Sequence, residues 1–217
     1  MGTHAHDIPD TSATRSDNPP GRGLLLVISG PSGVGKTTIA HAVERSIPAA
    51  RFSVSYTTRP RTNADREGVD YHFVSIERFK EMQQAGDLLE SAQVFGNWYG
   101  TGKAWVLEEM AAGAVVILEI DVEGGKQIRK HIPEMYGVFI MPPTEEELLR
   151  RLRARDREDE STIQKRFAEA KREMAEAISC NSYDAFIVNR ELNIAIRDVV
   201  GLVQGRLNLA AVSEKNT

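Results

Sequence analysis

The chain has 217 residues, of which 41% are hydrophobic and 27% charged, with a formal net charge of −4 and one cysteine. This balance is typical of a globular protein of one domain, and no stretch approaches the ~20 apolar residues that span a bilayer. The acidic net charge argues against a protein that coats nucleic acid, and Cys180 cannot form an internal disulfide. Since the N-terminus also lacks an export signal pattern, we expect a cytoplasmic protein with no nucleic-acid partner and no membrane partner.

Buried strands and amphipathic helices alternate along the chain after a polar start. Residues 1–22 hold three prolines and no hydrophobic period, so a disordered N-terminal tail is expected. Apolar or β-branched runs then predict strands at Leu24–Ser29, Phe52–Tyr56, Tyr71–Val74, Leu88–Val94, Ala114–Ile120, Tyr136–Met141 and Asp184–Val188. Helical periodicity predicts helices from Lys36 to about Ile47, at Ile76–Ala85, Lys103–Ala112 and Val122–His131, from Thr144, from Ser161 to about Ser179, and from Glu191 onward.

The order of these elements predicts an α/β fold with a mostly parallel sheet flanked by helices. The segment from about Ser53 to Thr101 breaks the alternation and indicates an inserted mixed α+β region. Within it, Thr57–Val69 is expected to be a loop and Gly96–Gly102 a turn, because both are rich in turn formers. Capping-box patterns at Thr144–Glu147 and Ser161–Gln164 predict where two later helices begin.

The strongest local signal is a phosphate-binding turn between the first strand and the first helix. Its residues match the pattern G-x-x-x-x-G-K-[ST], with a buried strand before it and an amphipathic helix after it. Glycines let backbone N–H groups turn toward phosphate oxygens, while the lysine reaches the β- and γ-phosphates and the threonine hydroxyl binds Mg²⁺. We therefore predict that a nucleoside triphosphate contacts Gly30, Pro31, Ser32, Gly33, Val34, Gly35, Lys36, Thr37 and Thr38, a turn that GTPases and motor ATPases also carry.

Further clusters narrow the class of P-loop protein. They are Ser55–Arg61, Gly68–Tyr71, Leu89–Glu90 and Gly96–Thr101. Arginines and tyrosine hydroxyls at the ends of short strands are good ligands of a phosphate monoester. With these motifs the chain resembles the guanylate kinase family from about Leu24 to about Leu209. The shared motifs are G-P-S-G-V-G-K-T, S-x-T-T-R-P, D-Y-x-F-V, G-x-x-Y-G-T, L-E-I-D-V-x-G, R-L-x-x-R and I-V-N.

The resemblance implies a phosphotransferase of purine nucleotide metabolism that moves the γ-phosphoryl group of ATP to GMP, giving ADP and GDP. Glu90 matches the carboxylate that accepts the N1–H and N2–H₂ donors of guanine, which adenine does not offer. The positions that complete the base pocket are Ser55, Thr101 and Asp121, and those that grip the GMP phosphate are Arg59, Tyr71 and Tyr99. Asn189 matches a position near the adenine of ATP, and Glu119 a carboxylate that holds Mg²⁺ together with Thr37.

Basic residues cluster at Arg150–Arg157, which taken alone could be a solvated helix face. In the family this pattern belongs to a lid that brings arginines onto the transferring phosphoryl group, so the catalytic residues expected here are Lys36, Arg151, Arg155 and Arg166. The resemblance divides the chain into a core (23–54, 102–149 and 167–217), a GMP-binding region (55–101) and a lid (150–166).

Three departures from the family pattern bear on GMP affinity and on the lid. Thr62 stands where a second phosphate-gripping arginine is usual, Asn63–Asp65 replaces Pro-Gly-Glu, and Asp156 follows the lid arginine in place of glycine. Two other functions stay open: a guanylate-kinase-like module that binds proteins, and a kinase of a ribose bisphosphate. Retention of Lys36 and Arg166 argues against the first, and Glu90 against the second. Whether the chain acts as a monomer or a homo-oligomer is also open.

Overall fold

The computed structural model describes residues 23–154 and 159–214, with side chains described up to residue 208. Its strands are β1 (Leu24–Ser29), β2 (Ala50–Phe52), β3 (Tyr56–Thr57), β4 (His72–Phe73), β5 (Leu88–Val94), β6 (Asn97–Gly102), β7 (Val115–Glu119), β8 (Tyr136–Met141) and β9 (Ala185–Val188). Its helices are α1 (Lys36–Ser46), α2 (Ile76–Ala85), α3 (Lys103–Ala111), α4 (Val122–His131), α5 (Glu145–Arg153), α6 (Glu160–Ser179) and α7 (Leu192–Glu214).

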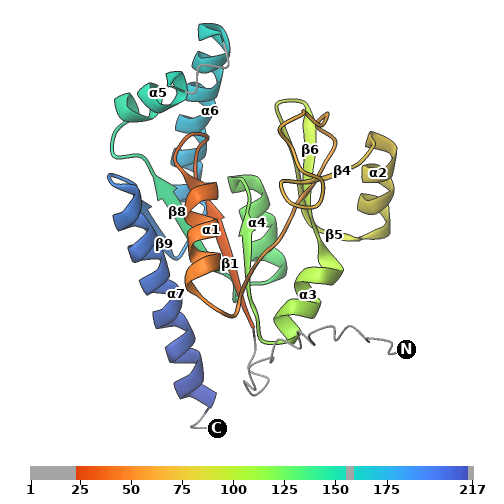
Figure 1. Cartoon of the computed structure of the whole chain (residues 1–217), viewed down its shortest axis with the longest axis vertical. Helices are drawn as coiled ribbons and strands as arrows, with labels where there is room; N and C mark the ends of the chain where they lie inside the picture. The colour runs from red at the N-terminus through yellow and green to blue at the C-terminus, as the bar shows by residue number, and fades with distance from the viewer. Residues whose placement is uncertain (1–22, 155–158, 215–217) are drawn as a thin grey trace, which may run out of the picture.

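The larger sheet has the strand order β2-β7-β1-β8-β9, and every neighbouring pair in it is parallel. The central strands β1, β7 and β8 are the apolar runs of the sequence and are buried along almost their whole length. A parallel sheet requires this, because helices cover both of its faces. The predicted α/β fold with a helix-flanked parallel sheet is confirmed (Figure 1).

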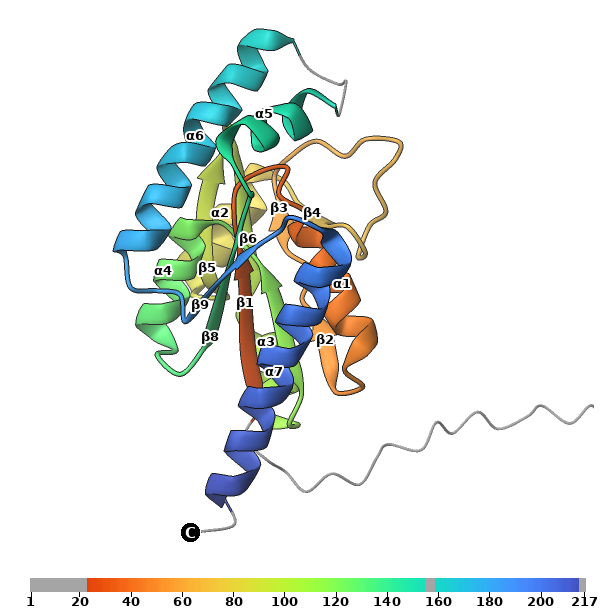
Figure 2. The same ribbon diagram turned by 90° about the vertical axis from the view of Figure 1, so that its left-hand side faces the viewer.

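Alternate residues of β1 enter two separate hydrophobic clusters. Leu26 and Ile28 pack with apolar side chains of α1 and α7 on one face of the sheet. Leu25 and Val27 pack with α3 and α4 on the other face. A third cluster joins β8 to α5 and α6, which stand beyond the end of the sheet where β1 runs into α1 (Figure 2). This third cluster places α6 beside the phosphate-binding turn.

The smaller sheet has the order β4-β3-β6-β5 and mixes parallel with antiparallel pairs. It stands to one side of the larger sheet, and α2 lies against it (Figure 1). The helix is held by Phe79, which is fully buried and stacks on Trp98 of β6 with 5.9 Å between the ring centroids. The expected inserted α+β region therefore exists, while its exact division into GMP-binding region, lid and core stays a prediction.

Two predicted elements are wrong. The strand expected at Phe52–Tyr56 is split, because Phe52 pairs with β7 of the larger sheet while Tyr56 pairs with β4 and β6 of the smaller one. The turn expected at Gly96–Gly102 is strand β6 from Asn97 onward, and only Phe95 and Gly96 make the turn. Pairing with β5 overrides the turn preference of the Asn and Gly residues in this segment.

Of the two predicted helix N-caps, one is confirmed and one is wrong. Thr144 caps α5 as predicted, since its hydroxyl accepts the N–H of Glu147 at 3.1 Å. Ser161 does not cap α6, because the helix begins at Glu160 and Asp159 accepts the N–H of Thr162 at 2.8 Å. Aspartate is an equally good cap and lies two residues earlier in the chain.

Some predictions fall outside the described residues, namely the tail 1–22, the catalytic Arg155 and the departure at Asp156. Among the helices of the described ranges, none is both long enough and apolar enough to cross a membrane.

Candidate active site

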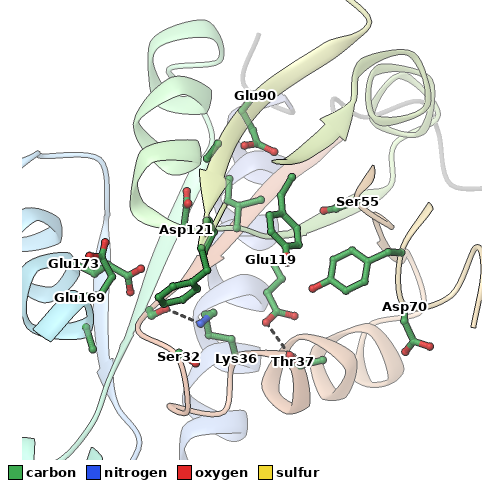
Figure 3. A pocket seen from close by; sticks show the side chains of 18 of the residues that line it. Ser32, Lys36, Thr37, Ser55, Asp70, Glu90, Glu119, Asp121, Glu169 and Glu173 are labelled. Carbon is green, nitrogen blue, oxygen red and sulfur yellow. Dashed lines mark hydrogen bonds between the residues drawn. The ribbon is translucent and has the colours of Figure 1, made fainter. Parts of the chain in front are cut away.

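The turn after β1 has the backbone conformation of a phosphate-binding loop. Gly35 caps α1 with φ 98° and ψ 18°, in the left-handed region that residues with a Cβ rarely adopt. The Nζ of Lys36 donates to the carbonyl oxygens of Gly30 at 2.6 Å and Pro31 at 3.1 Å, so the ammonium group lies over the turn (Figure 3). The turn thus offers a helix N-terminus and a lysine to one anionic ligand.

Thr37 and Glu119 meet beside this turn. The Oγ1 of Thr37 donates to the Oε1 of Glu119 at 2.8 Å (Figure 3). The contact arises because β7, which ends in Glu119, pairs directly with β1. A hydroxyl and a carboxylate fit Mg²⁺, which prefers oxygen ligands and takes its remaining ligands from water and substrate phosphates. The described residues contain no cluster of three or more His, Cys, Asp or Glu side chains that could hold a metal on their own.

A buried carboxylate marks the other end of the same cleft. Glu90 on β5 is only 5% exposed, and its Oε1 accepts the hydroxyl of Thr101 on β6 at 2.7 Å. The first turn of α4 covers it, because a Cβ added at Gly124 would lie 2.7 Å from Glu90 Oε2 and 3.3 Å from Asp121 Oδ1. Asp121 holds that turn in place by accepting the N–H of Gly124 at 2.7 Å.

Burial raises the pKa of Glu90 to about 7, helped by the negative charge of Asp121 and opposed by the Thr101 hydroxyl. The pKa of Asp121 is raised as well, again mainly by burial, against the opposing effects of the Gly124 N–H and Lys36. Two carboxyl groups that are poorly hydrated and close together favour a ligand that brings hydrogen-bond donors to them.

An aromatic and basic group forms the outer wall of this end of the cleft. The rings of Tyr71 and Tyr99 meet edge to face at 5.6 Å, and the guanidinium carbon of Arg59 lies 5.3 Å from the centre of the Tyr71 ring. Burial raises the pKa of Tyr71 to about 12, so its hydroxyl stays protonated at neutral pH. The wall therefore offers phenol and guanidinium donors to an anion.

Asp65 holds Arg59 by two hydrogen bonds, of 3.0 Å from Nη1 and 2.8 Å from Nη2. The same carboxylate accepts both the N–H and the hydroxyl of Thr62, each at 2.7 Å. The guanidinium beside it keeps the pKa of Asp65 well below its usual range. The unusual residue Thr62 thus has a structural role, since it closes the loop onto the carboxylate that orients Arg59.

Arg151 and Asn189 connect α5 to the phosphate-binding turn. Arg151 donates to Glu147 at 2.7 Å and to the backbone carbonyl of Asn189 at 3.0 Å. The side-chain N–H of Asn189 donates to the carbonyl of Val34 at 2.8 Å, and the residue is buried. In this structure both residues hold the turn from behind.

One cleft of about 410 Å³ brings most of the predicted site residues together. Those that line it are Gly30, Ser32, Lys36, Thr37, Ser55, Tyr71, Glu90, Tyr99, Glu119, Asp121 and Arg166. Thr101 lies behind Glu90 and Arg59 behind Tyr71, each in direct contact with its lining neighbour. Among the described residues, the other predicted ones that do not line it are Pro31, Gly33, Val34 and Gly35 of the turn, with Thr38, Arg151 and Asn189.

Several lining residues were missed by the sequence analysis, above all Glu169 and Glu173 of α6 and Phe95 of the β5–β6 turn. Figure 3 shows both glutamates on the side of the cleft that faces Lys36 and Asp121. Burial raises the pKa of Glu173 to about 7. Their spacing from Arg166, three and seven residues along one helix, was the available signal.

The parallel sheet, the phosphate-binding turn between its strand β1 and helix α1, and the Thr37–Glu119 pair define a P-loop protein. The guanylate kinase family model matches residues 22–205. The chain therefore belongs to the guanylate kinase family.

Similar proteins support this membership. A guanylate kinase of Anaeromyxobacter dehalogenans is 46% identical over 183 residues, which cover 84% of this chain and 80% of that protein. One of Nitrosomonas europaea is 43% identical over 180 residues, or 83% of this chain and 88% of that protein. The crystal structure of guanylate kinase from Anaplasma phagocytophilum superposes with a TM-score of 0.71 at 30% identity, covering 86% of this chain and 87% of that one.

Proposed function

We propose that this chain transfers the γ-phosphoryl group of ATP to GMP, with ATP on the P-loop and GMP at the end of the cleft that holds Glu90. The observation that carries the acceptor assignment is the buried carboxylate of Glu90, closed in by Thr101 and Gly124. A carboxylate placed there accepts two parallel N–H donors, and guanine presents such a pair on N1 and N2. Adenine has an acceptor at N1, so it would leave the buried charge unpaired.

The remaining acceptor contacts follow from the wall around Glu90. Ser55 and Asp121 line the same cleft and would reach the base from its sides. Tyr71, Tyr99 and Arg59 supply hydroxyl and guanidinium donors for the phosphate. Asp65 holds the guanidinium of Arg59 beside Tyr71, where it would face the phosphate as the arginine of this wall.

Phosphoryl transfer from ATP to GMP needs alignment and positive charge rather than a general base, because the attacking phosphate oxygen is already anionic. Lys36 would leave the carbonyls of the turn and neutralise charge on the β- and γ-phosphates. Arg166 would approach the same group from α6, and Arg151 would hold α5 against the turn. Arg155 is proposed as a further lid arginine on the resemblance alone.

Thr37 and Glu119 are the residues that would hold Mg²⁺. When bound, the ion would supply positive charge that offsets the negative charge developing on the phosphates during transfer. The activity belongs to purine nucleotide metabolism, and a cytoplasmic location is consistent with the free thiol of Cys180.

A coupled assay of ADP release with ATP and Mg²⁺ tests the proposal. The acceptors offered separately are GMP, AMP, dTMP and ribose 1,5-bisphosphate, and a Glu90→Gln variant is measured beside the native protein. We expect turnover with GMP, and a fall in kcat/KM for GMP of about 100-fold in the variant, because a charge-assisted pair of hydrogen bonds is lost.

A matched control is Glu173→Gln, which removes a half-buried carboxyl with a similarly raised pKa from the same cleft but lies on α6 rather than on β5. It should leave the preference for GMP over AMP unchanged. Turnover with the ribose bisphosphate in place of GMP would show that the P-loop is functional and the acceptor site serves another substrate. No turnover with any of the four acceptors would favour the protein-binding module.

A further inference from the structure

The tip of the β5–β6 hairpin holds an aromatic residue in an unfavourable backbone conformation. Val94 pairs with Asn97, which leaves Phe95 and Gly96 as a two-residue turn with φ values of 48° and 83°. Two positive φ angles are the signature of a type I′ turn, in which asparagine, aspartate or glycine is preferred at the first position. A bulky side chain with positive φ is rare because its Cβ crowds the backbone.

The side chain of Phe95 is also poorly buried. It is 58% exposed, although burial of a phenylalanine is among the larger apolar contributions to folding. The turn itself is closed without the ring, since the side-chain amide of Gln93 donates to the carbonyl of Gly96 at 3.3 Å. Two unfavourable features therefore coincide at one residue, and the hairpin gains nothing evident from either.

The ring is aimed across the cleft at the lid side. The guanidinium carbon of Arg166 lies 5.3 Å from the centre of the Phe95 ring, within the range of a cation–π contact. Both residues line the cleft, one from the hairpin and one from α6. The contact thus joins the part of the molecule that holds Glu90 to the part that carries the arginine expected at the phosphoryl group.

We propose that Phe95 is a positioning residue, whose ring receives the Arg166 guanidinium and keeps it at the acceptor side of the cleft for phosphoryl transfer. Because Phe95 and Glu90 belong to the same β5–β6 hairpin, the ring would keep Arg166 in a fixed relation to the carboxylate proposed to bind the acceptor base. This inference rests on the proposed function, in which Arg166 stabilises the transferring group. The positive φ angle of Phe95 is unfavourable, and it persists because the turn must place an aromatic ring, rather than asparagine, beside Arg166.

Three substitutions separate the ring from the turn. Phe95→Asn relieves the backbone strain and removes the ring, Phe95→Leu removes the ring and keeps the strain, and Phe95→Trp keeps an aromatic face. In Phe95→Asn we expect an unchanged or higher Tm, together with a single-turnover rate that falls about two- to fivefold, the size of one exposed cation–π contact. Phe95→Leu should lose the same rate, Phe95→Trp should retain it, and KM for GMP should stay unchanged in all three.

A double-mutant cycle with Arg166→Gln tests whether Phe95 acts through the arginine. In the Arg166→Gln background, Phe95→Asn should have no further effect on the rate. Ile178→Ala is the control, because Ile178 is 63% exposed on the same helix, twelve residues from Arg166, and should leave the rate unchanged.

The contact itself is tested without turnover, by the ring-current shift of the Arg166 δ protons in the nucleotide-free protein, which Phe95→Leu should abolish. Three results would each overturn the inference. The native protein could lack that shift, the rate losses of Phe95→Asn and Arg166→Gln could multiply in the double mutant, or Tm could fall together with the rate in Phe95→Asn. None of these results touches the proposed function, which fails separately if the native protein does not phosphorylate GMP.

Discussion

The two ends of the cleft are built by different means. At the end proposed for ATP, eight consecutive residues supply the turn, and its backbone and one helix N-terminus would do most of the binding. At the end proposed for GMP, the hydroxyl of Thr101 on β6 and the first turn of α4 enclose the buried carboxylate of Glu90 on β5, and Tyr71 and Tyr99 form the outer wall. The first site is local in sequence and the second is made by tertiary packing.

This difference separates two kinds of recognition. A phosphate chain is the same in every nucleotide, so a backbone cradle and a lysine suffice for it. A purine base is distinguished from another by the order of its donors and acceptors, which requires a buried partner of fixed polarity. Changes at the ATP end should therefore damage turnover, and changes at the GMP end should damage the affinity and choice of the acceptor.

The largest effect is expected from Lys36→Met. The substitution removes the ammonium that donates to the carbonyls of the turn and is proposed to neutralise the phosphates, and it leaves the Glu90–Thr101 contact in place. We expect kcat to fall by about 100- to 1,000-fold, as when one preorganised group that stabilises transition-state charge is removed. GMP affinity, measured by calorimetry without ATP, should stay within twofold of the native value. An equal loss of GMP affinity would show that the two ends are not independent.

Most of the ATP end could be predicted because its determinants are adjacent in the chain. The apolar run of β1, the glycine pattern and the helix after it are all local signals, and α4 and β8 were predicted with their observed bounds. The contact of Thr37 with Glu119 was expected only in outline, since it depends on β7 pairing directly with β1.

The GMP end was predicted from family resemblance rather than from physical pattern. Nothing local to Glu90 indicates that it is buried, because the cover comes from Gly124, 34 positions later in the chain. The place of Glu173 opposite Lys36 likewise arises from tertiary contacts, whereas Thr62 reaches Asp65 only three residues along the chain. The turn expected at Gly96–Gly102 failed for the same reason, since strand pairing outweighed local composition.

Gly124→Ala should affect the acceptor end alone. The added methyl group would lie 2.7 Å from Glu90 Oε2, so the carboxylate must move or α4 must shift. We expect KM for GMP to rise by about 30- to 100-fold through misplacement of a charged hydrogen-bond acceptor, with kcat reduced by less than threefold. Gly201→Ala in α7 is the control, because nothing lies within 4 Å of its added methyl group. A kcat loss equal to the KM change would contradict the separation of the two ends.

The pH dependence of GMP binding should report the same carboxylate. The guanine donors require ionised Glu90, and its pKa is raised to about 7, so the protonated fraction grows as pH falls through this value. We expect KM for GMP to rise about tenfold from pH 8 to pH 6, as one titrating group predicts. Glu90→Gln should lack this dependence, whereas Glu173→Gln should keep it although the Glu173 pKa is also near 7. The phosphate of GMP also titrates in this range, but it does so equally for both variants. Comparing the pH dependence of KM between the two variants therefore removes its contribution.

The smallest effect is expected at the rim of the acceptor end, from Asp65→Asn. Asp65 accepts two of the five N–H donors of Arg59 and leaves others for a phosphate. We therefore expect Asp65 to orient the guanidinium rather than to compete with the GMP phosphate for it. We expect KM for GMP to rise about threefold, in keeping with the modest strength of a partly exposed ion pair, and AMP to remain a poor acceptor.

Glu81→Gln is the matched control for Asp65→Asn, since it breaks an exposed pair with Arg78 on α2, outside the cleft. It should leave every kinetic constant unchanged. If KM for GMP instead falls in Asp65→Asn, the aspartate competes with the substrate phosphate for Arg59. The loop that Thr62 closes onto Asp65 would then lower the affinity for GMP. Arg59 would bind the phosphate without help from Asp65, and Glu90 alone would select the base.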